Sequence, residues 1–501
     1  MYLSKSKYCL GVQCPKILWM DKNMPEQKAE QDQSRFEAGN MVGDLAMGYF
    51  GAYTEVPFCR EDKGQMLSTT QQLIEQGTPV IAEASFSYDG NFCSVDLLKK
   101  GEGGYEIVEV KSSSGEQTDT AGNVKVVYLD DMAYQYYVLT HAGLPVTKVS
   151  LMRLNKNYER QGDLDLQQLF VLTDCTELVK RMQDEIPARI DHIKQVATQQ
   201  MEPQMLLGRS CDDPYPCAYH NWCFRNLPQN NVFDIGFRFS KQNKEQMYRD
   251  GIIRMEDVLH SNIRLSHMQH LQIITALEDA PPHVDREKIQ QFLDTLHYPL
   301  YHLDFETYQQ VVPLWDGVKP YEQIPFQYSL HIQQTPCGEA EHKEYLAQAG
   351  EDCRRELAER LCADIPRDVC VLAFNAGFEK SRIQALANRF ADLRGHLMDI
   401  RENFVDLAMP FSAGHYYARQ MGGSYSIKVV LPAICGGDPD LDYNKLESIH
   451  NGSEAMAAFA SLHEKTPEEI AQTRTALLAY CKLDTLAMVK ILERLYAMVQ
   501  E

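Results

Sequence analysis

Two short acidic patterns, each inside an apolar segment typical of a strand, limit the possible folds of this chain more than any other sequence feature. The first is Glu109-Val110-Lys111, which follows Asp96 by thirteen residues, and the second is Asp304-Phe305-Glu306. Alternate side chains of a strand share a face, so each pattern places two charged groups on one sheet surface. Segments with helical spacing follow both patterns. The sequence therefore predicts two mixed α/β domains.

The length of 501 residues agrees with this division, because it is about three times the usual span of one folding unit. We predict a first domain at residues 1–228, a helical connector at 229–290 and a second domain at 291–501. Within them, helices are expected at 36–50 and 467–500, and strands at 80–100, 105–114 and 301–307.

Composition excludes several classes of protein. An apolar fraction of 44% with 24% charged residues argues against wholesale disorder. No apolar run approaches the roughly 20 residues that span a bilayer, and the first residues lack the apolar core of a signal peptide. We therefore expect a cytoplasmic protein without membrane contact. The chain has no G-x4-G-K-[ST] motif, so ATP is not an expected partner.

The first acidic pattern suits phosphodiester chemistry. Asp96 and Glu109 on neighbouring strands could hold a divalent cation, with Lys111 polarising the attacking water or the scissile phosphate. The alternative is an ordinary solvated strand face, which a lone E-x-K usually indicates.

Cysteines add a second feature to the first half. Cys211, Cys217 and Cys223 are spaced by six residues, and Cys14 and Cys9 lie far upstream. The paired C-x2-C knuckles of zinc sites are absent, so a four-thiolate iron-sulfur cluster fits better. The alternative is a set of buried free thiols, the interpretation given to the remaining cysteines, Cys481 among them.

The second acidic pattern extends over residues 291–501. Asp304 and Glu306 share a strand face, Glu379 follows the next apolar strand, and Asp484 lies one helical turn after Tyr480. Carboxylates in this order suit a site for two divalent cations about 4 Å apart, with the tyrosine orienting a water molecule. Taken singly, each of these features is weak: an Asp-x-Glu pattern occurs by chance in most acidic proteins, and a tyrosine four residues before an aspartate is usually a packing contact.

Residues 1–228 resemble RecB-like members of the PD-(D/E)XK nuclease superfamily, in particular CRISPR-associated exonucleases with a four-cysteine 4Fe-4S cluster. The resemblance rests on Cys14 in CPK, Asp96 in SVDLL, Glu109 and Lys111 in EVK, and Gln135 in MAYQYY. It implies a restriction-endonuclease-like fold, catalytic roles for Asp96, Glu109, Lys111 and Gln135, and cluster ligation by Cys14, Cys211, Cys217 and Cys223. The CPK context favours Cys14 over Cys9.

One position departs from that family. Where the family has a metal-binding histidine, this chain has Gly43, and Asp44 or Glu37 could compensate. The first metal site is therefore expected to be one ligand short.

Residues 296–496 resemble the DEDD 3′-5′ exonucleases of RNase H-like fold, and Tyr480 with Asp484 resembles their tyrosine subclass. The resemblance implies that Asp304, Glu306, Glu379 and Asp484 bind metal and that Tyr480 places the water. Glu379 stands where the family usually has aspartate. As a whole, the chain resembles a bacterial family that joins the two kinds of nuclease domain.

The combined expectation is a Mg²⁺- or Mn²⁺-dependent exonuclease that acts on DNA, in repair or in defence against foreign DNA. An RNA exonuclease is one alternative, and a nucleic-acid-binding scaffold with decayed sites is another. The formal net charge of −21 predicts a weak, salt-dependent hold on long duplexes, which favours short ends or a recruiting protein partner.

Overall fold

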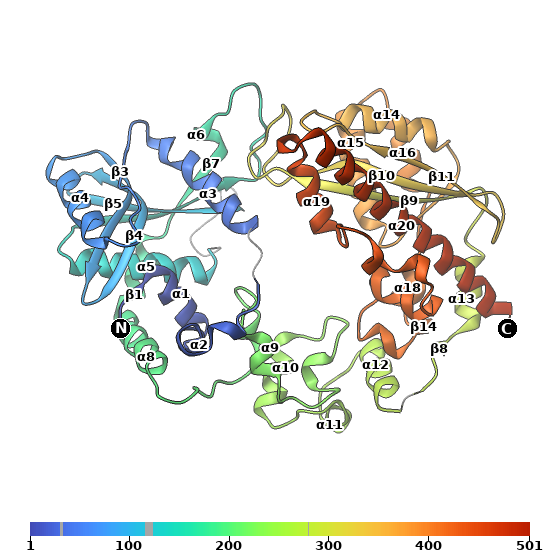
Figure 1. Cartoon of the computed structure of the whole chain (residues 1–501), viewed down its shortest axis with the longest axis horizontal. Coiled ribbons are helices and arrows are strands. Elements are labelled where there is room, and N and C mark those ends of the chain that lie inside the picture. Colours follow the sequence, from blue (N-terminus) through green and yellow to red (C-terminus); the bar gives the residue numbers. More distant parts are fainter. Residues whose placement is uncertain (31–33, 116–123, 279, 501) are drawn as a thin grey trace. The chain divides into compact units, whose positions relative to one another are not determined.

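The fold is described from a computed structural model of the chain, for residues 1–30, 34–115, 124–278 and 280–500 (Figure 1). The chain divides into two compact units. The first unit comprises Met1–Leu227 and Gln310–Glu322, and the second comprises Pro228–Gln309 and Gln323–Glu501. Both units are mixed α/β, as the sequence predicts.

Among the described residues, the first unit is built on a seven-stranded sheet of order β2-β3-β4-β5-β6-β7, with β1 paired to β4. Neighbours β3, β4 and β5 pair antiparallel, whereas β5 and β6 run parallel and are joined through helix α5. The strands are β1 (Leu3–Ser4), β2 (Thr54–Glu55), β3 (Val80–Tyr88), β4 (Asn91–Gly101), β5 (Gly104–Gly115), β6 (Val146–Asn155) and β7 (Phe170–Asp174). The helices are α1 (Lys5–Gln13), α2 (Lys16–Asn23), α3 (Ser34–Met47), α4 (Lys63–Glu75), α5 (Val126–His141), α6 (Leu166–Leu169), α7 (Thr176–Arg181), α8 (Ile186–Ala197) and α9 (His220–Phe224).

Apolar side chains cover both faces of this sheet. Ile107 of β5 belongs to the layer that includes residues of α1 and α5, and Val108 belongs to the layer that includes residues of α3. Because side chains alternate along a strand, Glu109 and Lys111 share the face of Ile107. The first acidic pattern therefore faces α1 and α5.

In the described part of the second unit, a five-stranded sheet has the order β11-β10-β9-β12-β13. Strands β9, β10 and β11 form an antiparallel meander, and β12 and β13 are added in parallel beyond β9. The strands of this unit are β8 (His283–Val284), β9 (Leu300–Gln309), β10 (Gln323–Gln333), β11 (Ala340–Leu346), β12 (Cys370–Ala373), β13 (Phe404–Asp406) and β14 (Tyr416–Tyr417). Its helices are α10 (Lys241–Arg249), α11 (Met255–Leu259), α12 (His267–Glu278), α13 (Arg286–Leu293), α14 (Arg354–Asp364), α15 (Gly377–Arg389), α16 (Arg394–Glu402), α17 (Met409–Ser412), α18 (Ile427–Cys435), α19 (Gly452–Ala460) and α20 (Pro467–Gln500).

The long closing helix α20 has the bounds that the sequence predicts, and it packs along β9 and β10 (Figure 1). The opposite face of the sheet is covered by α14, α15 and α16, whose apolar side chains pack with Leu303 and Phe305 of β9. Alternation then turns Asp304 and Glu306 toward α20.

Residues 229–290, predicted as a helical connector, contain α10, α11 and α12, and the division into units places them in the second unit. The segment Gln310–Glu322 lies between β9 and β10 in the chain but belongs to the first unit. In the described ranges, we find no helix with both the length and the apolar character needed to cross a bilayer.

Candidate functional site

The second unit gathers acidic side chains between β9 and α20. Asp304 and Glu306 come from β9, and Asp484 comes from the buried face of α20. Tyr480 lies one helical turn before Asp484, so it faces the same way. The electrostatic interactions of Asp304 include Asp484, Glu306 and Glu379, which shows that the sequence-predicted acids lie near one another.

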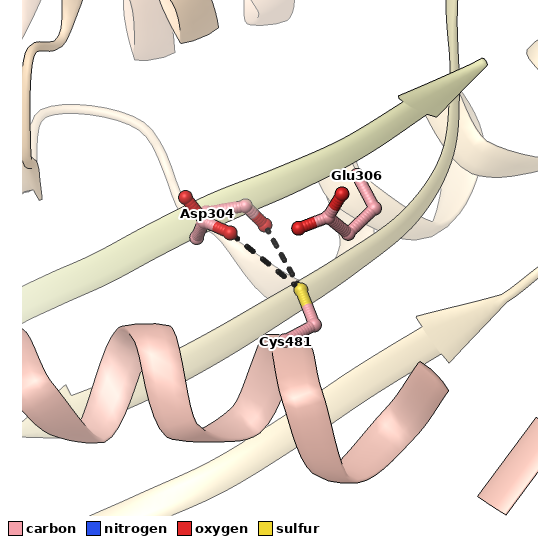
Figure 2. Close-up of side chains that lie close together, drawn as sticks. All are labelled: Asp304, Glu306 and Cys481. Carbon is pink, nitrogen blue, oxygen red and sulfur yellow. Dashed lines mark hydrogen bonds between the residues drawn. The ribbon is translucent and has the colours of Figure 1, made fainter. Parts of the chain in front are cut away.

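Cys481 lies beside the two strand acids (Figure 2). Its thiol donates to Asp304, with Sγ 3.7 Å from Oδ2 and 3.8 Å from the backbone oxygen. One ligand atom each of Asp304, Glu306 and Cys481 lie within 4.8 Å of one another, close enough to share a metal ion. Cys481 was expected to be an ordinary buried thiol, although its helical spacing from Asp484 could have indicated this position.

Asp484 is held by two tyrosines. The hydroxyl of Tyr443 donates a 2.6 Å hydrogen bond to Oδ1 of Asp484, and Tyr480 also hydrogen bonds to this carboxyl group. The rings of the two tyrosines lie 6.1 Å apart, centroid to centroid. Tyr443 was not predicted from the sequence, because it lies in a 3-10 helix of three residues, Tyr443–Lys445, which is too short to leave a periodic pattern.

Glu379 enters the cluster from the first turn of α15. Its side chain is buried, and Oε2 has no hydrogen-bond partner within the described structure. Asp406, at the end of β13, lies close enough to influence Glu379, and it accepts hydrogen bonds from the backbone N–H groups of Asn375 and Ala408, each 2.9 Å long. A buried carboxylate oxygen without a donor is costly, and a bound cation would satisfy it.

The electrostatics of this cluster show a shortage of positive charge. Burial and the neighbouring Asp484 raise the pKa of Asp304 well above its usual value and that of Glu306 to about 8. Burial, together with Asp406, raises the pKa of Glu379 to about 8. Burial also raises the pKa of Asp484 to about 6, against the lowering effect of the Tyr443 hydrogen bond. Acids that repel one another in this way are typical of cation sites and of catalytic sites.

An open pocket adjoins the cluster. Lys428 of α18, Tyr443 and His450 are among its lining residues. The Lys428 ammonium donates a 2.6 Å hydrogen bond to the carbonyl of His450, and it lies 5.2 Å and 5.3 Å from the ring centroids of Tyr443 and Tyr480. Lys428 also lowers the pKa values of Glu306 and Asp484 against the effect of burial. A basic side chain can contact a phosphate group, and aromatic rings beside it can stack on a nucleobase.

The first unit brings Asp96, Glu109, Lys111 and Gln135 together. Lys111 donates to Oε1 of Glu109 at 2.5 Å, and the Gln135 amide donates to Oε2 of Glu109 at 2.6 Å. Asp96 accepts a 2.7 Å hydrogen bond from the backbone N–H of Val110. Burial alone would raise the pKa of Glu109, but Lys111 and Lys5 hold it well below its usual range.

Three members of this cluster were missed by the sequence analysis. Asp131 accepts hydrogen bonds from Lys111 at 2.7 Å and from Gln135 at 3.1 Å. Its position four residues before Gln135 on a helix was the available signal. Glu83 lies between Ala82 and Ala84, which pair with Leu97 and Val95 on either side of Asp96, and burial and Asp96 raise the pKa of Glu83 to about 7. Lys5, the third, comes from the start of α1.

Gly43 and the two acids that could compensate for the missing histidine, Glu37 and Asp44, all lie on α3. Gly43 lies within α3, and a Cβ added there would meet no atom within 4 Å. Glu37 and Asp44 are both exposed.

The four cysteines predicted as cluster ligands, Cys14, Cys211, Cys217 and Cys223, line one pocket. All are free thiols, and burial raises the pKa of Cys217 to about 11. Cys9 lies elsewhere, near Asp131 and Lys111. Four thiolates around one zinc ion would bring their sulfurs to about 3.8 Å from one another. Among the described residues, these cysteines do not form a group with their sulfurs all within 4.8 Å of one another.

Comparison with known proteins gives one match. A family model described as a domain of unknown function (DUF2779) matches residues 301–426, from β9 to the turn after β14. The matched region contains Asp304, Glu306 and Glu379 but ends before α20. No curated protein and no solved structure matches the chain.

Proposed function

We propose that this chain is a metal-dependent nuclease, and that the acidic cluster of the second unit hydrolyses phosphodiester bonds at the 3′ ends of DNA. The observation that carries the proposal is the convergence of four acids from three elements, all with raised pKa values: the half-buried Asp304 and the buried Glu306, Glu379 and Asp484. Folding acids together at this electrostatic cost is expected where cations are bound.

The donor set fits Mg²⁺ or Mn²⁺, because these cations prefer carboxylate oxygens and Oε2 of Glu379 has no partner in the described structure. When bound, such cations activate a water molecule and neutralise the charge that develops on the phosphate. Asp304, Glu306, Glu379 and Asp484 would hold them. Tyr443 and Tyr480 hydrogen bond to Asp484, and in the proposed reaction Tyr480 would orient the attacking water.

The folds of the two units support the nuclease types that the sequence resembles. In the second unit, an antiparallel meander extended by parallel strands carries its acids on the central strand, which supports an RNase H-like exonuclease domain. In the first unit, the mixed sheet with Asp96, Glu109, Lys111 and Gln135 on one face supports a RecB-like PD-(D/E)XK domain.

A 4Fe-4S cluster is proposed for the cysteine pocket. Cys14 precedes the other three ligands by about the whole length of the first unit, so a cluster there would tie the two ends of this unit together. Thiolate ligands are what such clusters require.

We also propose two alternative functions. An RNA exonuclease would use the same cations and carboxylates. A nucleic-acid-binding or partner-recruiting scaffold with decayed nuclease sites is favoured by Gly43 in the first unit and by Glu379 in the second.

The test uses end-labelled single-stranded DNA and RNA with Mg²⁺ or Mn²⁺. We expect metal-dependent shortening of DNA from the 3′ end and a loss of about 10³-fold or more in Asp304→Asn, because a metal ligand is removed. Glu468→Gln, an exposed acid on α20, is the matched control and should keep full activity. Shortening of RNA alone would support the first alternative, and intact DNA and RNA would support the scaffold.

A further inference from the structure

The first acidic cluster contains a positive charge that the sequence pattern does not reveal. Nζ of Lys5 lies 3.4 Å from Oδ1 of Asp96, 3.2 Å from Oε2 of Glu109 and 4.0 Å from Oδ1 of Asp131. Only 20% of the Lys5 side chain is exposed. One ammonium group is therefore shared by three carboxyl groups, in the place where a bound cation would have to lie.

The backbone that presents Lys5 is held by neighbouring elements. Leu3 and Ser4 form β1, which pairs in parallel with Asn91 and Phe92 of β4. The carbonyl of Leu3 accepts a 2.6 Å hydrogen bond from the hydroxyl of Tyr134 on α5. Leu3 itself is fully buried. These contacts fix the start of α1 over the cluster, so the direction of Lys5 is set by the fold.

The charges of the first cluster are almost balanced by the protein. Burial alone would lower the pKa of Lys5, but Asp96, Glu109 and Asp131 raise it well above its usual value. Lys111 supplies a second ammonium, so two positive groups stand among Asp96, Glu109, Asp131 and Glu83, and burial and Asp96 raise the pKa of Glu83 to about 7. The second unit differs, because its nearby Lys428 donates to a carbonyl and the pKa of Glu306 still rises to about 8.

The number of side chains available to bind a metal also argues against a divalent cation in the first cluster. Helix α3 offers no side chain at Gly43, where the resemblance predicts a metal-binding histidine, and the space around it is open. A divalent cation at Asp96 and Glu109 would lack this ligand and would also have to displace the Lys5 ammonium.

We propose that Lys5 takes the place of the divalent cation in the first cluster, so that this half of the chain neither binds a metal there nor cuts a phosphodiester bond. The inference rests on the proposed assignment of the first cluster to a nuclease-type site. It also predicts that removing the ammonium converts the cluster into a cation site. Asp96, Glu109 and Asp131 would then face one another with Lys111 as the remaining ammonium described there, beside the neutral Gln135 amide.

The test measures Mn²⁺ binding, by the electron paramagnetic resonance signal of free Mn²⁺, to the full-length chain with the second cluster removed by Asp304→Asn and Asp484→Asn. In this background, the chain with Lys5 should bind no ion that depends on Glu109. Lys5→Gln should gain one Mn²⁺ ion, bound about tenfold or more tightly than any ion in the parent. Lys7→Gln, an exposed lysine on the same helix, is the control and should gain none.

Two results would overturn the proposal. One is a Mn²⁺ ion bound by the Lys5-containing chain and lost on Glu109→Gln, which can be measured even if Lys5→Gln fails to fold. The other is a folded Lys5→Gln chain, checked by circular dichroism, that gains no ion. Both results are independent of the proposed exonuclease activity. That activity is measured by comparing the wild-type chain with Asp304→Asn, whereas Mn²⁺ binding is measured in a background that lacks the second cluster.

Discussion

At the scale of single residues, Cys481 changes the chemistry expected of the second cluster. Oxygen ligands alone favour Mg²⁺ and Mn²⁺, whereas a thiolate adds affinity for softer ions such as Zn²⁺ and Cd²⁺. Burial and Asp304 raise the pKa of the Cys481 thiol well above its usual value, so it is protonated until a metal displaces the proton. The site should therefore accept a soft ion in an inhibitory complex.

We predict that Cys481→Ser weakens the inhibition of Mn²⁺-dependent activity by Cd²⁺ about tenfold, because the soft ion loses its sulfur ligand. The measurement is the Cd²⁺ concentration that halves activity. Cys362→Ser, a cysteine on the opposite side of the sheet, should leave this concentration unchanged. Equal sensitivity of wild type and Cys481→Ser would show that the thiol does not bind the ion.

Tyr443 supports the same site through Asp484. Tyr443→Phe removes the 2.6 Å hydrogen bond to this carboxyl group, and residues that orient metal ligands typically contribute 10- to 100-fold. We therefore expect a loss of about tenfold in the affinity for Mn²⁺, measured by titrating activity with the metal. Tyr345→Phe, on the outer strand β11, should behave as wild type, and an unchanged Mn²⁺ requirement in Tyr443→Phe would contradict the role.

At the scale of elements, α20 is tied to β10 by a chain of hydrogen bonds. Nδ1 of His331 lies 2.8 Å from the hydroxyl of Thr485, which lies 2.6 Å from the hydroxyl of Ser329, and that hydroxyl lies 3.0 Å from Nε2 of His342. Gln327 also donates to the carbonyl of Leu477 at 2.8 Å. These bonds fix the position of the helix that carries Asp484 against the sheet that carries Asp304.

This chain of bonds predicts sensitivity to acid. Burial, with His342, His302 and Lys482 nearby, lowers the pKa of His331 to about 3. The unfolded state binds a proton near pH 6.5 and the folded state does not, so the stability from neutral His331 is complete above pH 6.5 and is lost as the pH falls toward 3. The advantage of wild type over His331→Gln in free energy of unfolding should shrink over that range. An advantage that stays constant between pH 7 and 4.5 would refute the prediction, and His270→Gln is the control.

Local periodicity in the sequence predicts many of the site residues, whereas contacts between distant segments bring the others to the site. Strand alternation places Asp304 and Glu306 on one face, and helical spacing places Tyr480 beside Asp484, so these neighbours could be predicted. The same helical rule would have found Cys481. It could not have found Lys5, whose position depends on β1 pairing with β4, because register between distant segments leaves no local pattern. Tyr443 could not have been found either, because its 3-10 helix of three residues is too short to show a period.

At the scale of the whole molecule, the cysteine pocket closes the first unit on itself. Cys14 follows α1, and the other three thiols lie in the last part of Met1–Leu227. A centre held by both ends removes conformational freedom from the unfolded chain, as any covalent closure of a long loop does.

We predict that the protein purified without oxygen is brown, and that Cys217→Ser loses the absorbance and has a lower melting temperature. The expected fall is several degrees or more, since a bond that closes a long loop contributes about 2–4 kcal/mol. Absorbance, iron content and thermal unfolding are measured together, with Cys59→Ser as the control. A colourless protein that contains zinc would exclude the cluster.

The segment Gln310–Glu322 leaves each unit discontinuous along the gene. Val311, Val312 and Tyr321 pack in the first unit's apolar layer, Arg160 donates to the carbonyl of Pro313, and Tyr321 donates to the carbonyl of Ser112. A fragment that ends at residue 228 would contain the sheet of the first unit without the segment that covers its apolar layer. Deleting the segment from the full chain would change the connection between β9 and β10 in the second unit. Neither unit can therefore be transferred to another protein as one continuous stretch of sequence.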